Sequence, residues 1–212
     1  MDHTTIWKRR QALQAVPSAP PYRDVIAAVD TTGFSTTLRG EWMRDVWHKR
    51  RGFVKAHVMV DVLTLEVLSV VVTDHTVGDD RVFAMLIDRA LDRGIVVRRV
   101  LADGAYDTLD NFDVLHERGI EAGIKNDRRA TMLSRGHSRA RSRAVHERNS
   151  IGQDAWASKY EYSLRWMIEY VFSAVKRTLG SEVRSHRRDL MFSEVENKFW
   201  TWNAMRLEDL RN

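Results

Sequence analysis

The 212-residue sequence contains no cysteine. Disulfide bonds, zinc–thiolate sites and cysteine nucleophiles are therefore excluded. Long apolar runs are also missing, since the longest, around residues 67–72, is far too short to span a bilayer. The start of the chain is polar and has no apolar signal core. We therefore expect a cytoplasmic protein that does not enter a membrane.

Proline is scarce, and its three copies, Pro17, Pro20 and Pro21, all lie near the start. Residues 1–24 show little periodicity, so we expect them to form an N-terminal arm. No glycine-rich phosphate loop follows, which leaves an ATP-driven motor without support. Hydrophobic residues make up 43% of the chain, enough for the core of a single domain over residues 25–212.

The positive charge is unevenly distributed. The net charge is +5, and residues 126–150 alone carry +5, from seven arginines minus two acidic residues. Clustered arginine indicates a polyanionic partner, most simply nucleic acid. From charge alone, a solvated loop explains the segment equally well.

The hydrophobic pattern predicts alternating strands and helices. Apolar, β-branched runs predict strands at the following residues: 25–29, 57–62, 66–72, 96–101 and 120–124. Helical spacing predicts helices at the following residues: 82–91, 107–118, 161–179 and 194–210. A basic insertion, residues 126–160, precedes the third helix. This order predicts an α/β fold with a mixed sheet flanked by helices. It matches the RNase H-like arrangement, in which the first and fourth strands are neighbours.

Two aspartates stand directly after predicted strands. Asp30 follows the first strand and Asp103 follows the fourth. Carboxylates at strand ends bring oxygen ligands from distant parts of a chain to one point, and Mg²⁺ prefers such ligands. Taken alone, each aspartate is better explained by a turn, because Asp-Thr-Thr-Gly and Asp-Gly are common turn sequences.

The predicted helix 161–179 carries a narrow polar stripe. Tyr162, Arg165, Glu169 and Lys176 fall within a sector about 60° wide. Apolar side chains fall on the opposite side: Met167, Ile168, Val171, Val175 and Leu179. The simpler alternative is an ordinary amphipathic helix, with an Arg165–Glu169 pair worth about 0.3 kcal/mol.

These motifs together resemble a known family. The stripe 162–176 matches without a gap the signature Y-x2-R-x3-E-x6-K of transposases of the IS4 group of bacterial and archaeal insertion sequences. Residues 29–34 resemble the first aspartate motif of that group and of the related IS5 group, and residues 101–107 resemble the second. The resemblance runs from about residue 25 to residue 206.

The resemblance implies an RNase H-like DDE catalytic domain over residues 25–212, with a short basic insertion, 126–160, before the helix that bears the glutamate. Asp30, Asp103 and Glu169 would be the catalytic triad and would hold Mg²⁺ or Mn²⁺, with two ions expected. The enzyme would cleave DNA at insertion-sequence ends and join the free 3′ hydroxyls to target DNA.

The resemblance also implies double-stranded DNA as the partner, both transposon ends and target, with a homodimer in the DNA complex. By this resemblance Tyr162, Arg165 and Lys176 are expected to contact DNA. The clustered positive charge adds further expected contacts from the insertion, namely Arg128, Arg139, Arg141 and Arg143. Because family members usually carry a larger N-terminal region that recognises transposon ends, we expect a truncated product. Two alternatives stay open: a nuclease that cuts without joining strands, and a non-catalytic DNA-binding remnant.

Overall fold

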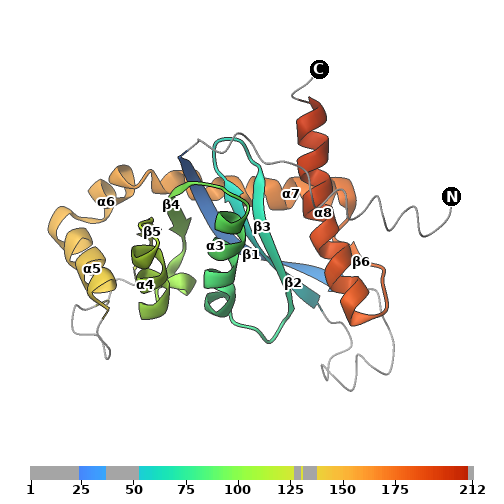
Figure 1. The fold of residues 1–212 in the computed structure, drawn as a ribbon, viewed down its shortest axis with the longest axis horizontal. Coiled ribbons are helices and arrows are strands. Elements are labelled where there is room, and N and C mark those ends of the chain that lie inside the picture. Colours follow the sequence, from blue (N-terminus) through green and yellow to red (C-terminus); the bar gives the residue numbers. More distant parts are fainter. Residues whose placement is uncertain (1–23, 37–52, 127–129, 131–137, 210–212) are drawn as a thin grey trace.

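The computed structural model describes residues 24–36, 53–126, 130 and 138–209 (Figure 1). The predicted arm, apart from its last residue, and Arg128 lie outside the described residues. None of the described helices is both long and apolar enough to cross a membrane.

One mixed sheet forms the centre of the described part. Its strands are β1 (Val25–Thr36), β2 (Phe53–Asp61), β3 (Val67–Asp74), β4 (Val97–Ala102), β5 (Glu121–Ile124) and β6 (Glu182–Val183). The order across the sheet is β3-β2-β1-β4-β5, and the short β6 pairs with the end of β1. β1 runs antiparallel to β2 and parallel to β4, so the predicted adjacency of the first and fourth strands is confirmed.

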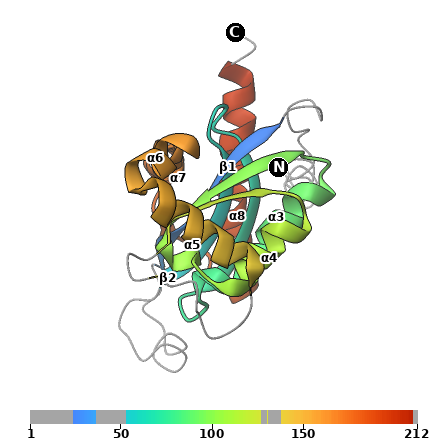
Figure 2. The ribbon, with the colours of Figure 1, turned by 90° about the vertical axis from the view of Figure 1, so that its left-hand side faces the viewer.

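Helices cover both faces of this sheet. The helices are α3 (Phe83–Asp92), α4 (Leu109–Glu117), α5 (Arg139–Ile151), α6 (Gln153–Lys159), α7 (Met167–Leu179) and α8 (Arg188–Asp209). Side chains of α3 and α4 pack on one face, and side chains of α7 and α8 pack on the other. Figures 1 and 2 show α5 and α6 at the β5 side of the sheet. The predicted α/β sheet flanked by helices is confirmed.

Alternation along β1 determines which residues face each layer. Ile26 and Ala28 pack toward α7 and α8, whereas Ala27 and Val29 pack toward α3 and α4. Since successive side chains of a strand point to opposite faces, Asp30 continues the α7 series. Thr31 consequently faces the α3 side.

β1 is longer than its apolar run predicts. The sequence predicts a strand over residues 25–29 and a turn that starts at Asp30, but β1 continues to Thr36. The reason is its antiparallel partner, since residues 27–35 of β1 pair with residues 53–61 of β2. This pairing satisfies backbone groups that the local sequence would leave to a turn. Asp30 therefore lies in the middle of a central strand.

The helix predicted over 161–179 has an unexpected start. Glu161 adopts a left-handed conformation, with φ 54°, and a 3₁₀ turn follows over Tyr162–Trp166 before α7 begins at Met167. The prediction of a single regular helix from residue 161 is therefore wrong for its first turns. The apolar face is confirmed, because Ile168, Val171 and Val175 are buried.

Candidate active site and basic surface

Asp30 and Asp103 lie side by side at the centre of the sheet. In the parallel register of β1 and β4, Ala28 is paired with Leu101, and each aspartate lies two residues further along its own segment. Asp30 Oδ1 accepts a 2.8 Å hydrogen bond from its neighbour's amide, Thr31 N. Asp103 Oδ1 accepts a 2.9 Å bond from Ala105 N and so caps a 3₁₀ turn at 104–106. Backbone amides thus hold both carboxylates.

Arg165 connects this pair to the glutamate of α7. One guanidinium nitrogen, Nη1, lies 3.0 Å from Asp30 Oδ2, and the other, Nη2, lies 3.2 Å from Glu169 Oε1. The guanidinium therefore links a carboxylate of β1 to one in the first turn of α7. Glu169 itself is open to solvent, with 60% of its side chain exposed.

Burial is the main influence on the protonation of Asp30. Burial raises the pKa of the Asp30 carboxyl above its ordinary value, and the nearby charge of Asp103 acts in the same direction. The Thr31 amide and Arg165 act to lower this pKa, but the net shift is upward. Two adjacent carboxylates that repel each other favour a bound cation.

The donor set has the chemistry of a divalent-metal site, although the three carboxylates are not gathered around one point. Among the residues that the structure describes, no three acidic or histidine side chains are close enough to hold a metal ion together. Asp30 and Asp103 offer carboxylate oxygens, the ligands that Mg²⁺ prefers. Glu169 is joined to them through Arg165. The residues fit a hard divalent cation at the aspartate pair.

The other two members of the polar stripe lie on either side of this centre. The Tyr162 hydroxyl donates to the carbonyl oxygen of Ala102 at 3.3 Å, directly before Asp103. Lys176 Nζ lies 5.4 Å from the ring centroid of Phe34, further along β1 than Asp30. Burial lowers the pKa of Lys176 and raises the pKa of Tyr162. The stripe therefore follows β1, with Arg165 and Glu169 between its ends.

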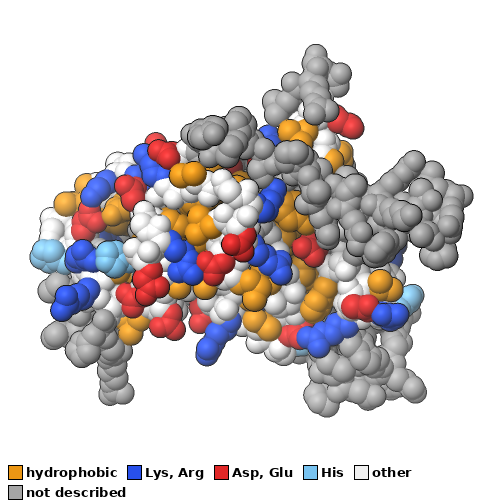
Figure 3. All heavy atoms as spheres, viewed as in Figure 1, with side chains coloured by type: hydrophobic (Ala, Val, Ile, Leu, Met, Phe, Trp, Pro, Cys, Tyr) orange, Lys and Arg blue, Asp and Glu red, His pale blue; other side chains and the backbone are white. Residues whose placement is uncertain are grey.

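The arginines of the basic insertion have different surroundings. Arg139 and Arg143 are exposed on α5. Arg141 instead makes a bidentate pair with Asp107, at 2.8 and 2.9 Å, and only 12% of its side chain is exposed. Arg148 is buried and donates to a backbone carbonyl. Figure 3 shows basic and histidine side chains at the α5 end of the molecule, interspersed with acidic ones. The exposed charge of the described insertion therefore belongs to Arg139 and Arg143 rather than to every arginine.

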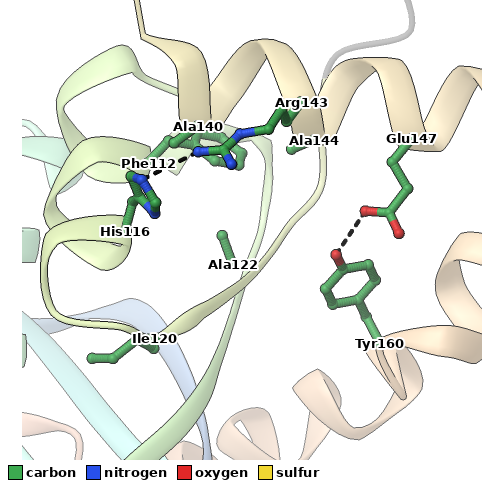
Figure 4. A pocket seen from close by; sticks show the side chains of 9 residues that line it. All are labelled: Phe112, His116, Ile120, Ala122, Ala140, Arg143, Ala144, Glu147 and Tyr160. Carbon is green, nitrogen blue, oxygen red and sulfur yellow. Dashed lines mark hydrogen bonds between the residues drawn. The ribbon is translucent and has the colours of Figure 1, made fainter.

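A cavity of about 300 Å³ lies beside α5, away from the carboxylates (Figure 4). Apolar side chains of α4, β5 and α5 line it, and two polar pairs stand around it, Arg143 with His116 and Glu147 with Tyr160. The acidic residues expected to carry chemistry are not among its lining residues. This cavity is therefore separate from the candidate active site.

A buried polar network lies behind Asp30, and the sequence did not predict it. Thr31 Oγ1 lies 2.8 Å from His57 Nδ1 and 3.2 Å from the Tyr106 hydroxyl oxygen. His57 Nε2 lies 2.8 Å from Thr73 Oγ1. Thr31 and Tyr106 fall within the two aspartate motifs, so the sequence offered a signal for these two residues. The sequence around His57 offered no such signal, because only the pairing of β2 with β1 brings this residue next to Thr31.

The central aspartate pair on an α/β sheet and the glutamate on a following helix define a domain with RNase H-like architecture and an acidic centre. The profile of the family described as "Transposase DDE domain" matches residues 21–204, most of the chain. The chain belongs to this family. DDE transposases act on DNA and generally use divalent metal ions.

Proposed function

We propose that this domain cleaves DNA at insertion-sequence ends and transfers the strands into target DNA, with Asp30, Asp103 and Glu169 as its metal-holding residues. The observation that carries the proposal is the Arg165 guanidinium, which joins Asp30 to Glu169. The register of β1 and β4 adds Asp103 beside Asp30. The Y-x2-R-x3-E-x6-K spacing and the two aspartate motifs support assignment to the IS4/IS5 superfamily.

Each part of the centre has a distinct task in this proposal. Two bound Mg²⁺ or Mn²⁺ ions would stabilise the attacking and leaving oxygens of the phosphodiester. The sheet holds Asp30 and Asp103 in place, and α7 supplies Glu169 from above the sheet. No side chain acts as nucleophile: a water molecule attacks first, and the freed 3′ hydroxyl of the DNA attacks second.

The basic members of the stripe position the DNA. Arg165 is a planar donor with 21% of its side chain exposed, so it is reachable by a phosphate while it contacts both carboxylates. Lys176 supplies a second positive charge further along β1. Contacts of this kind fix the register and orientation of a duplex without reading its sequence. Tyr162, beside the Asp103 segment, completes the DNA-contacting set, and Arg139 and Arg143 extend it onto α5.

The test is an assay that scores cleavage and joining separately. A duplex made from the inverted repeats beside the gene is incubated with the protein and Mg²⁺ or Mn²⁺, and nicks and joined products are quantified. Asp30→Asn, Asp103→Asn and Glu169→Gln should each abolish both products. The matched control is Asp92→Asn, which changes an exposed carboxylate at the end of α3, on the opposite face of the sheet.

Persistent cleavage by Asp30→Asn would overturn the assignment. Cleavage without joining would identify the domain as a nuclease, and binding without cleavage, when a separate end-binding region is also supplied, would identify a DNA-binding remnant. Light scattering of the complex tests the proposed homodimer, in which one copy acts at each transposon end.

A further inference from the structure

The most complete unassigned feature of the molecule is the buried network behind the aspartates. It lies on the face of the sheet that α3 covers, opposite the face of Asp30 and α7. His57 is fully buried and Tyr106 is almost so, with the Tyr106 ring packed 5.5 Å from that of Phe83. Neither side chain is placed to touch DNA, so any effect on the reaction must pass through other residues.

The hydrogen bonds of this network run in one direction. Thr73 donates its hydroxyl proton to the carbonyl oxygen of Asp74, so it accepts from His57 Nε2. Burial lowers the pKa of His57 to about 4, and the ring is neutral at pH 7. A neutral imidazole that donates from Nε2 accepts at Nδ1. Thr31 consequently donates to His57, and the Tyr106 hydroxyl donates to Thr31.

This direction leaves each member with a defined partner. In this arrangement the Tyr106 hydroxyl donates to Thr31 and the Thr31 hydroxyl donates to His57. Lys55 and Asp79, which pair at 2.9 Å, are the charged groups beside the imidazole, and Asp79 Oδ1 lies 3.7 Å from Nδ1. A satisfied buried network of this kind rigidifies its surroundings.

The network touches both aspartate segments. Thr31 donates its backbone amide to Asp30 Oδ1, while its side chain bonds to Tyr106. Tyr106 belongs to the 3₁₀ turn that Asp103 caps, and its amide donates to the Asp103 carbonyl oxygen at 3.2 Å. The Thr31–Tyr106 bond therefore ties β1 to the segment after β4, on the reverse side of the two carboxylates.

We propose that Thr31, His57 and Tyr106 form a positioning clamp that holds Asp30 and Asp103 at the spacing required to bind a divalent cation. The clamp rests on the proposed function, since it assigns the aspartate pair as the metal site. Its members are positioning residues. Residues that orient metal ligands from behind typically change metal affinity by about 10- to 100-fold when they are altered.

The first test measures Mn²⁺ affinity of the intact protein without DNA, from the electron paramagnetic resonance signal of free Mn²⁺. Thr31→Val keeps the shape of threonine and removes its hydroxyl, whereas Thr31→Ser keeps the hydroxyl. Tyr106→Phe removes the other end of the bond. We expect binding about 10- to 100-fold weaker for Thr31→Val and Tyr106→Phe, and near-wild-type binding for Thr31→Ser.

The matched control is Tyr160→Phe. It removes a tyrosine hydroxyl that donates to Glu147 at 2.8 Å, beside the cavity at α5 rather than at the aspartates. A general loss of stability would affect both tyrosine variants, but only Tyr106→Phe should weaken Mn²⁺ binding. Wild-type affinity in Tyr106→Phe and Thr31→Val would overturn the clamp.

A second measurement needs no metal. In amide NMR spectra, Tyr106→Phe should shift the Thr31 amide, which donates to Asp30, and Thr31→Val should shift the Ala105 amide, which donates to Asp103. Each probe is far in sequence from the changed residue. Unchanged amides would overturn the clamp even if Mn²⁺ binds. If the variants shift these amides but the wild-type protein binds no Mn²⁺, the metal site is overturned, and with it the clamp's role in metal binding.

Discussion

Arg165 donates a 3.0 Å hydrogen bond to Asp30 across a sequence separation of 135 residues. This hydrogen bond joins the 3₁₀ turn before α7 to the centre of β1, and the same guanidinium reaches Glu169. An ordinary amphipathic helix would need only the Arg165–Glu169 pair, which is local. The link to Asp30 places the polar stripe over the aspartate pair.

Arg165→Ala should separate stability from activity. The Arg165–Asp30 pair is only partly buried, so its loss should lower the free energy of unfolding by about 1 kcal/mol. If Arg165 also stabilises charge in the transition state, cleavage and joining should fall by about two to three orders of magnitude. Chemical denaturation and the strand-transfer assay measure the two effects.

Arg118→Ala is the control for this change. Arg118 pairs with Asp88 at 2.7 Å, and 25% of its side chain is exposed, close to the 21% of Arg165. The pair joins α4 to α3, on the opposite face of the sheet. A similar loss of stability with normal strand transfer is expected. Equal activity of the two variants would contradict the role given to Arg165.

Asp30→Asn should not destabilise the metal-free protein at neutral pH. A raised pKa means that protonated Asp30 favours the folded state at low pH, and that this benefit is lost as pH rises through the folded-state pKa. A neutral asparagine removes the cost of burying a charged carboxylate, which outweighs the loss of its pairing with Arg165, and it also removes the repulsion from Asp103. Thermal melts should show an unfolding temperature equal to or above wild type without metal, and stabilisation by added Mg²⁺ in wild type alone. A large drop without metal would make the carboxylate a structural group.

The arginines of α5 should differ in their effect on DNA binding. Changing Arg139 and Arg143 together to alanine should reduce the salt dependence of binding to random duplex DNA, by about 0.9 in the logarithmic slope for each phosphate that is no longer neutralised. Arg141→Ala should leave that slope unchanged. It should instead lower the free energy of unfolding by about 3 kcal/mol, because it removes the cationic partner of the buried Asp107 carboxylate, which then keeps a hydrogen bond from Asn126. A titration over several salt concentrations distinguishes these outcomes, and an unchanged slope in the double variant would exclude both residues from the DNA surface.

His57 should make the fold sensitive to mild acid. Its pKa is about 4 in the folded protein, mainly because of burial, against 6.5 ordinarily; Asp79 acts to raise it and Lys55 to lower it. The unfolded chain therefore binds this proton first as pH falls, so stability decreases from about pH 6.5 and levels off below about pH 4. The loss over that window is about 3 kcal/mol. Urea denaturation at several pH values should show this fall in wild type and a smaller one in His57→Gln; parallel curves would contradict it.

The positions of the main strands and the adjacency of β1 and β4 were predictable. Apolar runs marked β1 and β4, and the match of the element order to the RNase H-like arrangement indicated that they are neighbours, which brings Asp30 and Asp103 together. The apolar face of α7 followed from helical spacing, and burial of Val171 confirms it. These features depend on periodicity along a single segment, which a sequence displays directly.

Other features depend on partners that are distant in sequence. β1 continues past Asp30 because β2 pairs with it, and His57 reaches Thr31 through the same pairing. The two-residue strand β6 exists only where it meets the end of β1. The 3₁₀ turn before α7 replaces a regular helix because Glu161 turns left-handed there. No local pattern indicated these positions.

The long separation between β1 and α7 has a consequence for synthesis of the protein. A ribosome releases the strand that bears Asp30 early, but the helix that bears Glu169 and the strand β6 that closes on β1 emerge near the end. Pairings so distant in sequence form late in folding, after the intervening chain has been ordered. The proposed active site is therefore incomplete on any nascent chain that stops before α7, because such a chain lacks Glu169.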